Sequence, residues 1–313
     1  MYISILLSLL LGSVYVSAQT QYTATAPAAV EKARATALTL SPTSNVQGRS
    51  FNRFVTIWCE NTDFAIAAGD PNFKYLASQG ITLTNYKALT HPSQGNYVGA
   101  VGGSLNGVTG DSFTRISPSA KTIVDLLDAK GVSWSEYQED MPYSGFEGNA
   151  WVNQKNGRND YVRKHNPLIS YDSITTDPNR LAKIKNFTMF ERDLEADKLP
   201  QWLFITPNMT SDGHDTSVTV AGKWTRDLLD PLLKNPKFMD GTLVLVTFDE
   251  TESYTAANRV LALLLGDVIP TSQKGTSDSK AYTHYSQMAT VERNWDLGSL
   301  GLGDEGALSF FTG

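Results

Sequence analysis

The sequence has little of what would assign it to several common protein classes. Among 313 residues Cys59 is the single cysteine, so no disulfide can form within the chain. The formal net charge is only −6 and lysines and arginines are not clustered, which argues against nucleic acid and anionic membranes as partners. Stability must therefore come from burial, and a hydrophobic content of 41% is enough for one large core.

The amino terminus is typical of a targeting segment. Residues 1–11 are apolar and uncharged, and small residues at positions 16–18 follow them as a cleavage pattern. The stretch is too short to span a membrane as a helix. We predict a secretory signal peptide over residues 1–18, an extracellular or cell-wall location, and no integral membrane association. The Ala-, Thr- and Ser-rich residues 19–50 are expected to be a propeptide or a surface arm.

Two sequons would become glycosylation acceptors after secretion. They begin at Asn186, which is followed by Phe187 and Thr188, and at Asn208, which is followed by Met209 and Thr210. Because Asn208 lies next to the suspected functional site, we expect Asn186 to be the more reliably used of the two.

Apolar strand-like runs alternate with helical patterns from residue 51 onward. Strands are expected at residues 54–59, 81–84, 132–137, 202–206 and 243–248. Helices are expected at residues 73–78, 120–129, 187–197 and 223–233. The alternation predicts an α/β fold, a three-layer sandwich with a mostly parallel central sheet, as a single domain over residues 51–313. Residues 141–174 break the rhythm and are expected to form a wall over the site, and residues 270–282 a surface loop.

Three of the apolar strands end at an acid or an amide. Glu60 and Asn61 follow the first, Asn208 comes just after residues 202–206, and Asp249 and Glu250 follow residues 243–248. Ligands bind beyond the carboxyl ends of strands in open α/β sheets, so these ends predict one assembled site. Its hard oxygen ligands suit one divalent ion such as Mg²⁺, Ca²⁺ or Mn²⁺. The other interpretation of the Asp249–Glu250 pair is a helix cap or a solvated turn.

Ser93 and the few histidines supply the candidates for chemistry. Ser93 is expected to open a helix, where backbone N–H groups favour an anion, although a serine there can equally be a cap. His214 stands between Asp212 and Asp215, which could orient its imidazole. The remaining histidines are His165, in a basic stretch suited to an anionic substrate, and His91 and His284, for which packing is an equal alternative.

Six ordered blocks between residues 51 and 295 together resemble the phosphoesterase family of the alkaline phosphatase superfamily. That family contains secreted fungal acid phosphatases and bacterial and plant phospholipases C. The blocks are Glu60-Asn61, His91-Pro92-Ser93-Gln94-Gly95-Asn96-Tyr97, Lys164-His165-Asn166-Pro167, Pro207-Asn208 through Asp212-Gly213-His214-Asp215, Phe248-Asp249-Glu250, and Tyr282-Thr283-His284-Tyr285-Ser286.

The resemblance implies an alkaline-phosphatase-like fold and a role for each matched residue. Ser93 would be the nucleophile that forms a phosphoseryl intermediate. The phosphoryl group would be bound, or the leaving oxygen protonated, by His165, His214 and Asp215. The implied metal ligands are Glu60, Asn61, Ser93, Asp249 and Glu250. The implied substrate contacts are His91, Asn96, Asn208 and His284.

Departures from the family pattern select among its activities. After Asn61 the chain lacks the Arg and the following Asp-His usual in the phospholipase C branch. This favours a phosphomonoesterase, an acid phosphatase acting on small phosphorylated substrates, over a phospholipase C-type phosphodiesterase. Two other classes remain as alternatives. One is a Ser-His-Asp acyl ester hydrolase using Ser93 and His214, although His91 stands where a nucleophile elbow needs glycine. The other is a non-catalytic secreted binding protein.

Overall fold

The computed structural model describes residues 26–311, so the predicted signal peptide at residues 1–18 lies outside the described part of the chain. Its strands are β1 (Arg53–Cys59), β2 (Ile81–Lys87), β3 (Trp134–Gln138), β4 (Ala150–Val152), β5 (Asn159–Val162), β6 (Ile184–Asn186), β7 (Trp202–Thr206), β8 (Thr242–Phe248), β9 (Arg259–Gly266), β10 (Thr276–Asp278) and β11 (Tyr282–Thr283).

The helices alternate with these strands along the chain. They are α1 (Pro27–Arg34), α2 (Phe64–Gly69), α3 (Pro71–Ala77), α4 (Ser93–Gly102), α5 (Ile123–Lys130), α6 (Asp172–Thr175), α7 (Pro178–Leu181), α8 (Thr188–Glu195), α9 (Val218–Leu232), α10 (Pro236–Met239) and α11 (Tyr285–Trp295). Short 3-10 helices are η1 (Arg163–His165), η2 (Leu168–Ser170) and η3 (Thr271–Gln273).

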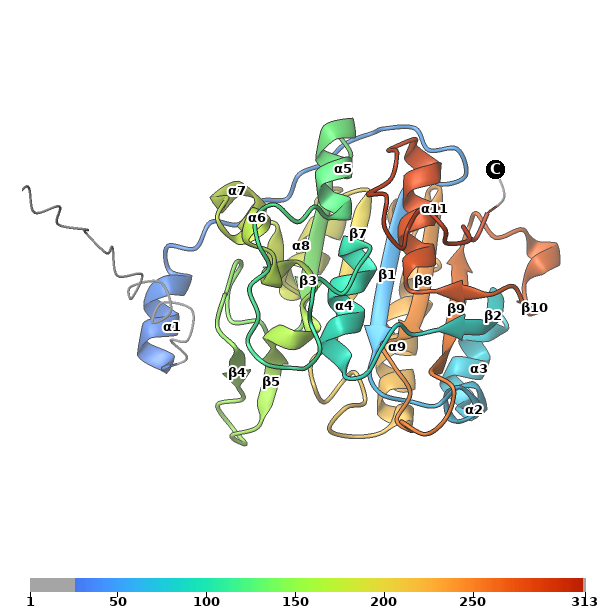
Figure 1. The fold of residues 1–313 in the computed structure, drawn as a ribbon, viewed down its shortest axis with the longest axis horizontal. Helices are drawn as coiled ribbons and strands as arrows, with labels where there is room; N and C mark the ends of the chain where they lie inside the picture. Colours follow the sequence, from blue (N-terminus) through green and yellow to red (C-terminus); the bar gives the residue numbers. More distant parts are fainter. Residues whose placement is uncertain (1–25, 312–313) are drawn as a thin grey trace, which may run out of the picture.

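One nine-stranded sheet forms the centre of the molecule. Its strand order is β10-β2-β9-β8-β1-β7-β3-β6, with β11 pairing with β2 off this path. Strand β9 runs antiparallel to both β2 and β8, and the other pairs are parallel. Helices α4, α5 and α11 cover one face, and α2, α3, α8 and α9 lie on the other (Figure 1). The predicted three-layer α/β sandwich with a mostly parallel sheet is confirmed.

Strand β1 is buried from both sides, which explains its continuous apolar sequence. Toward α4 and α11 it presents Trp58, whose ring lies 4.9 Å from that of Tyr97, and Thr56, which bonds to the Gln287 side chain at 3.1 Å. The next residue, Cys59, points to the opposite face. There its sulfur lies 3.5 Å from the Thr225 hydroxyl of α9. Burial raises the pKa of the Cys59 thiol to about 12, as expected for an inert core residue.

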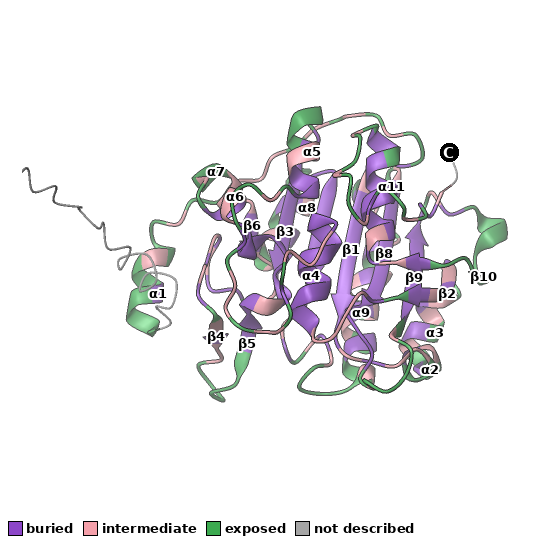
Figure 2. Ribbon diagram, in the orientation of Figure 1, coloured by how far each residue is buried: buried purple, intermediate pink, exposed green. Residues whose placement is uncertain are grey.

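Helix α4 is buried along its whole length, as Figure 2 shows for the helix in front of the central strands. Glycines make this close approach possible. A Cβ on Gly102 would lie 2.0 Å from the Tyr171 hydroxyl oxygen, and one on Gly99 would lie 2.5 Å from a methyl group of Leu89. The helix that opens at Ser93 is therefore fixed in the core rather than laid on the surface.

The predicted strands and helices are all present, with shifts at some ends. Helix α9 begins at Val218 rather than near residue 223, because the Ser217 side chain accepts a hydrogen bond from Val220 N and caps the helix. Helix α5 begins at Ile123 rather than at residue 120, after a capping box formed by Thr122 and Asp125.

The two segments expected to be loops contain regular structure. Residues 141–174 include the antiparallel β4–β5 hairpin and the 3-10 helices η1 and η2. Residues 270–282 include η3 and β10, and β10 extends the sheet beside β2. These strands have three or four residues each, too few to show an alternating apolar pattern, so they were not predicted from the sequence.

Residues 26–50 lie against the core. Val30 of α1 is 1% exposed, and Gln201 accepts hydrogen bonds from the Ser44 hydroxyl at 2.6 Å and from Val46 N at 2.8 Å. Their interpretation as a propeptide or surface arm stays a prediction. Among the described residues, no helix has both the length and the apolar character needed to cross a bilayer.

Candidate active site

The carboxyl ends of the central strands meet at one edge of the sheet. In the parallel pairing of β1 with β8, Cys59 lies opposite Phe248. Glu60 therefore follows β1 at the same level at which Asp249 and Glu250 follow β8. A hydrogen bond of 3.0 Å from Asp249 N to Cys59 O extends the ladder to this point. The strand ends bring these acids together, as their positions in the sequence led us to expect.

Ser93 is the first residue of α4 and points into this group of acids. Its Oγ lies 3.3 Å from Glu60 Oε2, 3.4 Å from Asn61 Oδ1 and 3.3 Å from Glu250 Oε1. The N-cap position belongs to Pro92, and the hydroxyl of Ser93 bonds to side chains rather than to the helix backbone. The placement at a helix N-terminus is as predicted, and the hydroxyl is free of a capping role.

The donor set around Ser93 fits a divalent cation. One hydroxyl proton faces three oxygen acceptors, so at most one of the three contacts can be an ordinary hydrogen bond. The Asn61 side-chain amide faces the same group: its nitrogen, when turned inward, can donate to Glu60 Oε2 at 3.0 Å, and its backbone N–H donates to Asp249 Oδ1 at 3.0 Å. Carboxylate and hydroxyl oxygens gathered in this way form the environment that Mg²⁺, Ca²⁺ or Mn²⁺ prefers.

The electrostatics of the acids point the same way. Glu60, Asp212, Asp249 and Glu250 are each at most 1% exposed. Burial raises the pKa of Asp249 and of Glu250 to about 7. Burial, and after it the neighbouring carboxylates, also raises the pKa of Glu60 and of Asp212 well above their ordinary values. Four buried acids destabilise one another when ionised, and a bound cation would relieve that repulsion.

The deep side of the site is formed by Tyr97 and His165. The Tyr97 hydroxyl donates to Glu60 Oε1, and its ring stacks on the His165 imidazole at 5.2 Å between centroids. His165 Nε2 lies 3.3 Å from Glu60 Oε2, and Nδ1 lies 3.6 Å from Asp212 Oδ2. Burial lowers the pKa of His165 well below its ordinary value, so the ring is neutral.

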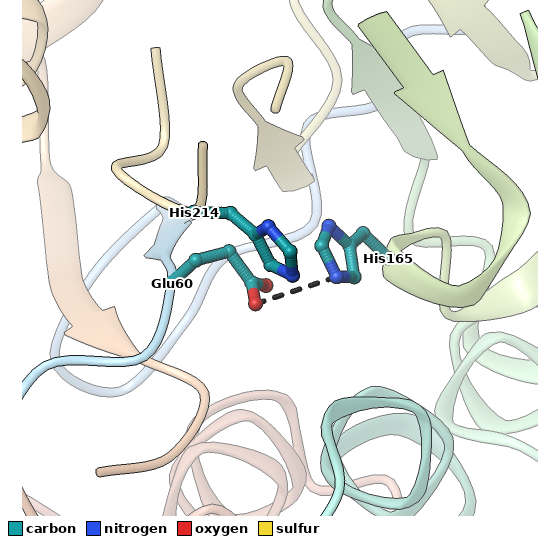
Figure 3. Close-up of side chains that lie close together, drawn as sticks. All are labelled: Glu60, His165 and His214. Atoms are coloured by element: carbon teal, nitrogen blue, oxygen red, sulfur yellow. Dashed lines mark ion pairs between the residues drawn. The ribbon is translucent and has the colours of Figure 1, made fainter. Parts of the chain in front are cut away.

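His214 approaches the same carboxylate from a more exposed loop. Its Nδ1 lies 2.9 Å from Asp215 Oδ1, and its backbone N–H donates to Asp212 Oδ1 at 2.8 Å. Figure 3 shows the side chains of His165, His214 and Glu60 converging, and one ligand atom from each lies within 4.8 Å of the others. In the described residues His165 Nε2 and Asp212 Oδ2 are buried without a hydrogen-bond partner, so this space can receive a cation or a phosphoryl group.

The outer side of the site is formed by His91 and Tyr254. His91 Nδ1 pairs with Glu250 Oε2, and the imidazole stacks on the Tyr254 ring at 3.9 Å. The Tyr254 hydroxyl lies 3.4 Å from Glu250 Oε1, and the side chain is 58% exposed. This side is therefore open to solvent.

The segment 141–174 contributes to the site through η1. It supplies His165, and Lys164 Nζ bonds to Asp111 Oδ2 at 2.9 Å. The other Asp111 oxygen accepts the Gln94 N–H at the start of α4, at 3.0 Å. Arg163, by contrast, is 2% exposed and donates to Glu147 O at 2.9 Å, so it holds the segment together rather than facing a substrate.

Three predicted substrate contacts lie beside the site in supporting positions. Asn96 Oδ1 accepts the N–H groups of Leu89 and Thr90 and so holds the loop before Ser93. His284 Nε2 lies 2.6 Å from the carbonyl oxygen of Asp249. Asn208 Oδ1 accepts the N–H groups of Thr210 and Ser211 and shapes the loop that leads to His214.

Both sequon asparagines are engaged in hydrogen bonds. Asn186 Nδ2 donates to Met141 O, and Asn208 Nδ2 donates to Asp140 Oδ2 at 2.5 Å. Glycosylation at either position stays a prediction.

Tyr97 and Asp212 complete the site. Tyr97 was not among its predicted members, and Asp212 was expected only as a carboxylate that could orient His214. A sequence signal existed for both. Tyr97 follows Ser93 by four residues, so the two share a face of one helix, and Asp212 stands two residues before His214. Neither signal could identify Glu60 or His165 as the partner, because those contacts join residues far apart in the chain.

The chain is similar in sequence to a known family and to characterised proteins. The sequence profile of the Phosphoesterase family matches residues 64–298. The chain is 54% identical over 279 residues to an acid phosphatase of Aspergillus fumigatus, covering 89% of this chain and 62% of the relative. It is 56% identical over 261 residues to a probable acid phosphatase of Kluyveromyces lactis, covering 83% and 62%. The chain thus spans 62% of the length of each of these two relatives.

Solved structures share the fold at low sequence identity. A protein in the alkaline phosphatase superfamily from Vibrio parahaemolyticus superposes with a TM-score of 0.52 at 13% identity, covering 90% of this chain and 78% of that one. A putative sulfatase from Bacteroides thetaiotaomicron gives a TM-score of 0.56 at 10% identity, covering 83% and 73%. These likenesses establish the alkaline-phosphatase-like fold alone.

Proposed function

This chain belongs to the phosphoesterase family, and we propose on that basis that it is an acid phosphatase that hydrolyses phosphate monoesters. The observation that carries the proposal is the position of Ser93 Oγ at the start of a buried helix, 3.3 Å from carboxylate oxygens of both Glu60 and Glu250. The high identity to fungal acid phosphatases supports the same activity.

In the proposed reaction Ser93 Oγ attacks the phosphorus atom of a monoester. A P–O bond to serine forms, the P–O bond to the leaving group breaks, and the serine proton passes to Glu60 Oε2 or Glu250 Oε1. The leaving alkoxide takes a proton from His214, whose ring is oriented by Asp215. Water then attacks the phosphoserine and gives a proton to His214, the P–O bond to Ser93 breaks, and Ser93 Oγ takes back the proton held by the glutamate, so that phosphate and free Ser93 are released.

A divalent cation, Mg²⁺, Ca²⁺ or Mn²⁺, would be held by Glu60, Asn61, Ser93, Asp249 and Glu250. When bound, it would favour ionisation of the Ser93 hydroxyl and neutralise charge on the phosphoryl group. The chain's own part is to bury these ligands, to hold Asn61 through Asp249, and to keep His165 neutral beside Glu60.

The apolar residues at the start of the sequence support secretion, and the absence of clustered basic residues supports small phosphorylated molecules as substrates. We include both in the proposal. The sequons at Asn186 and Asn208 would then meet the glycosylation machinery.

Three chromogenic substrates test the activity directly. Purified protein should hydrolyse p-nitrophenyl phosphate, with much slower turnover of bis-p-nitrophenyl phosphate and none of p-nitrophenyl acetate. A preference for the diester would replace the proposal by a phospholipase C-type phosphodiesterase. A preference for the acetate would replace it by an acyl ester hydrolase.

A further inference from the structure

Tyr97 lies one helical turn after Ser93 on α4, and its side chain is fully buried. Because residues four apart share a helix face, both side chains point toward the strand ends. The Tyr97 ring packs against Trp58 of β1 at 4.9 Å, against Phe204 of β7 at 6.2 Å and against the His165 imidazole at 5.2 Å. Contacts from β1, β7 and η1 therefore leave the ring little freedom to move.

Because the Tyr97 hydroxyl bonds to one oxygen of the Glu60 carboxylate, the two carboxylate oxygens have different partners. Glu60 Oε1 accepts the Tyr97 O–H, whereas Oε2 lies 3.3 Å from Ser93 Oγ and 3.3 Å from His165 Nε2. A carboxylate with one oxygen held by a rigid donor cannot rotate that oxygen away without losing the bond. The second oxygen is thereby fixed toward Ser93. Glu60 is 1% exposed, so bulk water does not compete for this position.

The stacking contact with the Tyr97 ring also restricts the orientation of the His165 imidazole. The two ring planes are inclined by only 19°, and His165 Nδ1 faces Asp212 Oδ2 at 3.6 Å. The imidazole is thus bounded by the tyrosine ring on one side and a carboxylate on another. A single side chain touches both groups that flank the deep side of the candidate site.

We propose that Tyr97 is a positioning residue, which orients Glu60 through its hydroxyl and His165 through its ring. The inference rests on the proposed function of the Ser93 site and adds a member that acts without touching the substrate. Outer donors to ligating carboxylates usually change metal affinity or activity by about 10- to 100-fold when removed.

Tyr171, which packs against the same helix α4, offers a matched control variant. Tyr171 is also fully buried, and its hydroxyl donates to Val98 O of α4 at 2.9 Å and accepts from Asn106 Nδ2 at 3.0 Å. None of its described hydrogen bonds reaches a carboxylate of the site. Tyr171→Phe therefore removes a buried tyrosine hydroxyl beside α4 without removing a donor to Glu60.

The experiment compares Tyr97→Phe with Tyr171→Phe in three measurements. Chelated protein is titrated with Mn²⁺ to obtain the metal affinity, p-nitrophenyl phosphate hydrolysis at saturating Mn²⁺ gives kcat and KM, and thermal unfolding gives Tm. We expect Tyr97→Phe to weaken Mn²⁺ binding and to lower kcat, each by about 10- to 100-fold, with KM nearly unchanged. Tyr171→Phe should lower Tm and leave Mn²⁺ affinity and kcat at wild-type values.

A second variant and a double-variant cycle keep the test decisive. Tyr97→Met fills apolar space without a donor, and the same loss of Mn²⁺ affinity is expected. If Tyr97 acts through Glu60, Tyr97→Phe should have far less effect in a Glu60→Gln background than in wild type. Equal behaviour of Tyr97→Phe and Tyr171→Phe would overturn the inference. The Mn²⁺ titration needs no substrate, so wild type inactive on every phosphomonoester would refute the proposed function separately.

Discussion

The two sides of Ser93 are built from the same residue types in different surroundings. On the deep side Glu60 meets Tyr97 and His165, all at most 2% exposed. On the outer side Glu250 meets His91 and Tyr254, and the tyrosine is 58% exposed. A glutamate, a tyrosine and a histidine thus recur, once packed in the core and once facing solvent. The buried residues on the deep side can keep their side chains in fixed positions, whereas the residues on the outer side are accessible to a substrate.

Ser93 lies between the two sides, and its removal has the largest expected effect on activity. Ser93→Ala should lower turnover by on the order of 10⁴-fold, because the proposed nucleophile is lost. Folding should change by no more than about 1 kcal/mol, since the Ser93 hydroxyl does not cap α4. Steady-state assays and thermal unfolding of the purified variant check both statements. Retention of more than a few per cent of activity would exclude Ser93 as the nucleophile.

The next effect concerns the acids that would hold a cation. Glu60→Gln and Asp249→Asn each remove a negative ligand and should lower both metal content and activity by about 10- to 100-fold. Elemental analysis before and after chelation, paired with the phosphatase assay, measures the two together. Asp227→Asn is the control, because it removes the same charge from an exposed pair with Lys223 on α9. Full activity of metal-free protein would contradict the metal assignment.

The role of His214 is tested by comparing substrates rather than by measuring metal content. A general acid matters most when the leaving group is a basic alkoxide. His214→Asn should therefore slow glycerol phosphate by about 100-fold or more and p-nitrophenyl phosphate far less. The ratio of the two kcat/KM values is the readout, and each substrate controls for the other. Equal losses would make His214 a binding residue rather than the general acid.

The smallest expected effect is the pH dependence of stability in the chelated protein. The pKa of Glu250 is raised by burial from 4.5 to about 7, so the unfolded chain releases this proton before the folded form does. The group therefore costs stability progressively as pH rises from 4.5 to 7, and the cost stays constant above that. His165 and His284, whose pKa values are lowered by burial, titrate in the opposite sense.

A difference measurement isolates the contribution of Glu250. The Tm of chelated Glu250→Gln minus that of chelated wild type should increase between pH 4.5 and 7 and then level off. A difference that falls with pH would show that Glu250 is ionised in the metal-free fold well below pH 7.

Sequence alone predicted the frame of the site because its strands are buried on both faces. Residues 54–59, 202–206 and 243–248 are continuous apolar runs for that reason, and their ends identified Glu60, Asp249 and Glu250. Ser93 was found through its helix start. The β4–β5 hairpin and β10 were missed because strands of three or four residues carry no readable period.

The side-chain partners could not be read from the sequence. Tyr97 and Glu60 are 37 residues apart, and their contact depends on how α4 crosses the end of β1. Asn96 and His284 were expected at the substrate, yet the structure shows Asn96 bonded to the loop before Ser93 and His284 behind Asp249. Sequence gives the chemistry of a side chain, but tertiary packing decides which way it faces.

Chemical trapping of the intermediate tests the central claim most directly. Protein mixed with p-nitrophenyl phosphate is quenched in acid within one turnover, digested, and examined by mass spectrometry for a phosphorylated peptide. The account predicts phosphate on Ser93 in the wild type and none at that position in Ser93→Ala. Phosphate on a histidine, or rapid hydrolysis with no phosphorylated residue at any quench time, would contradict it.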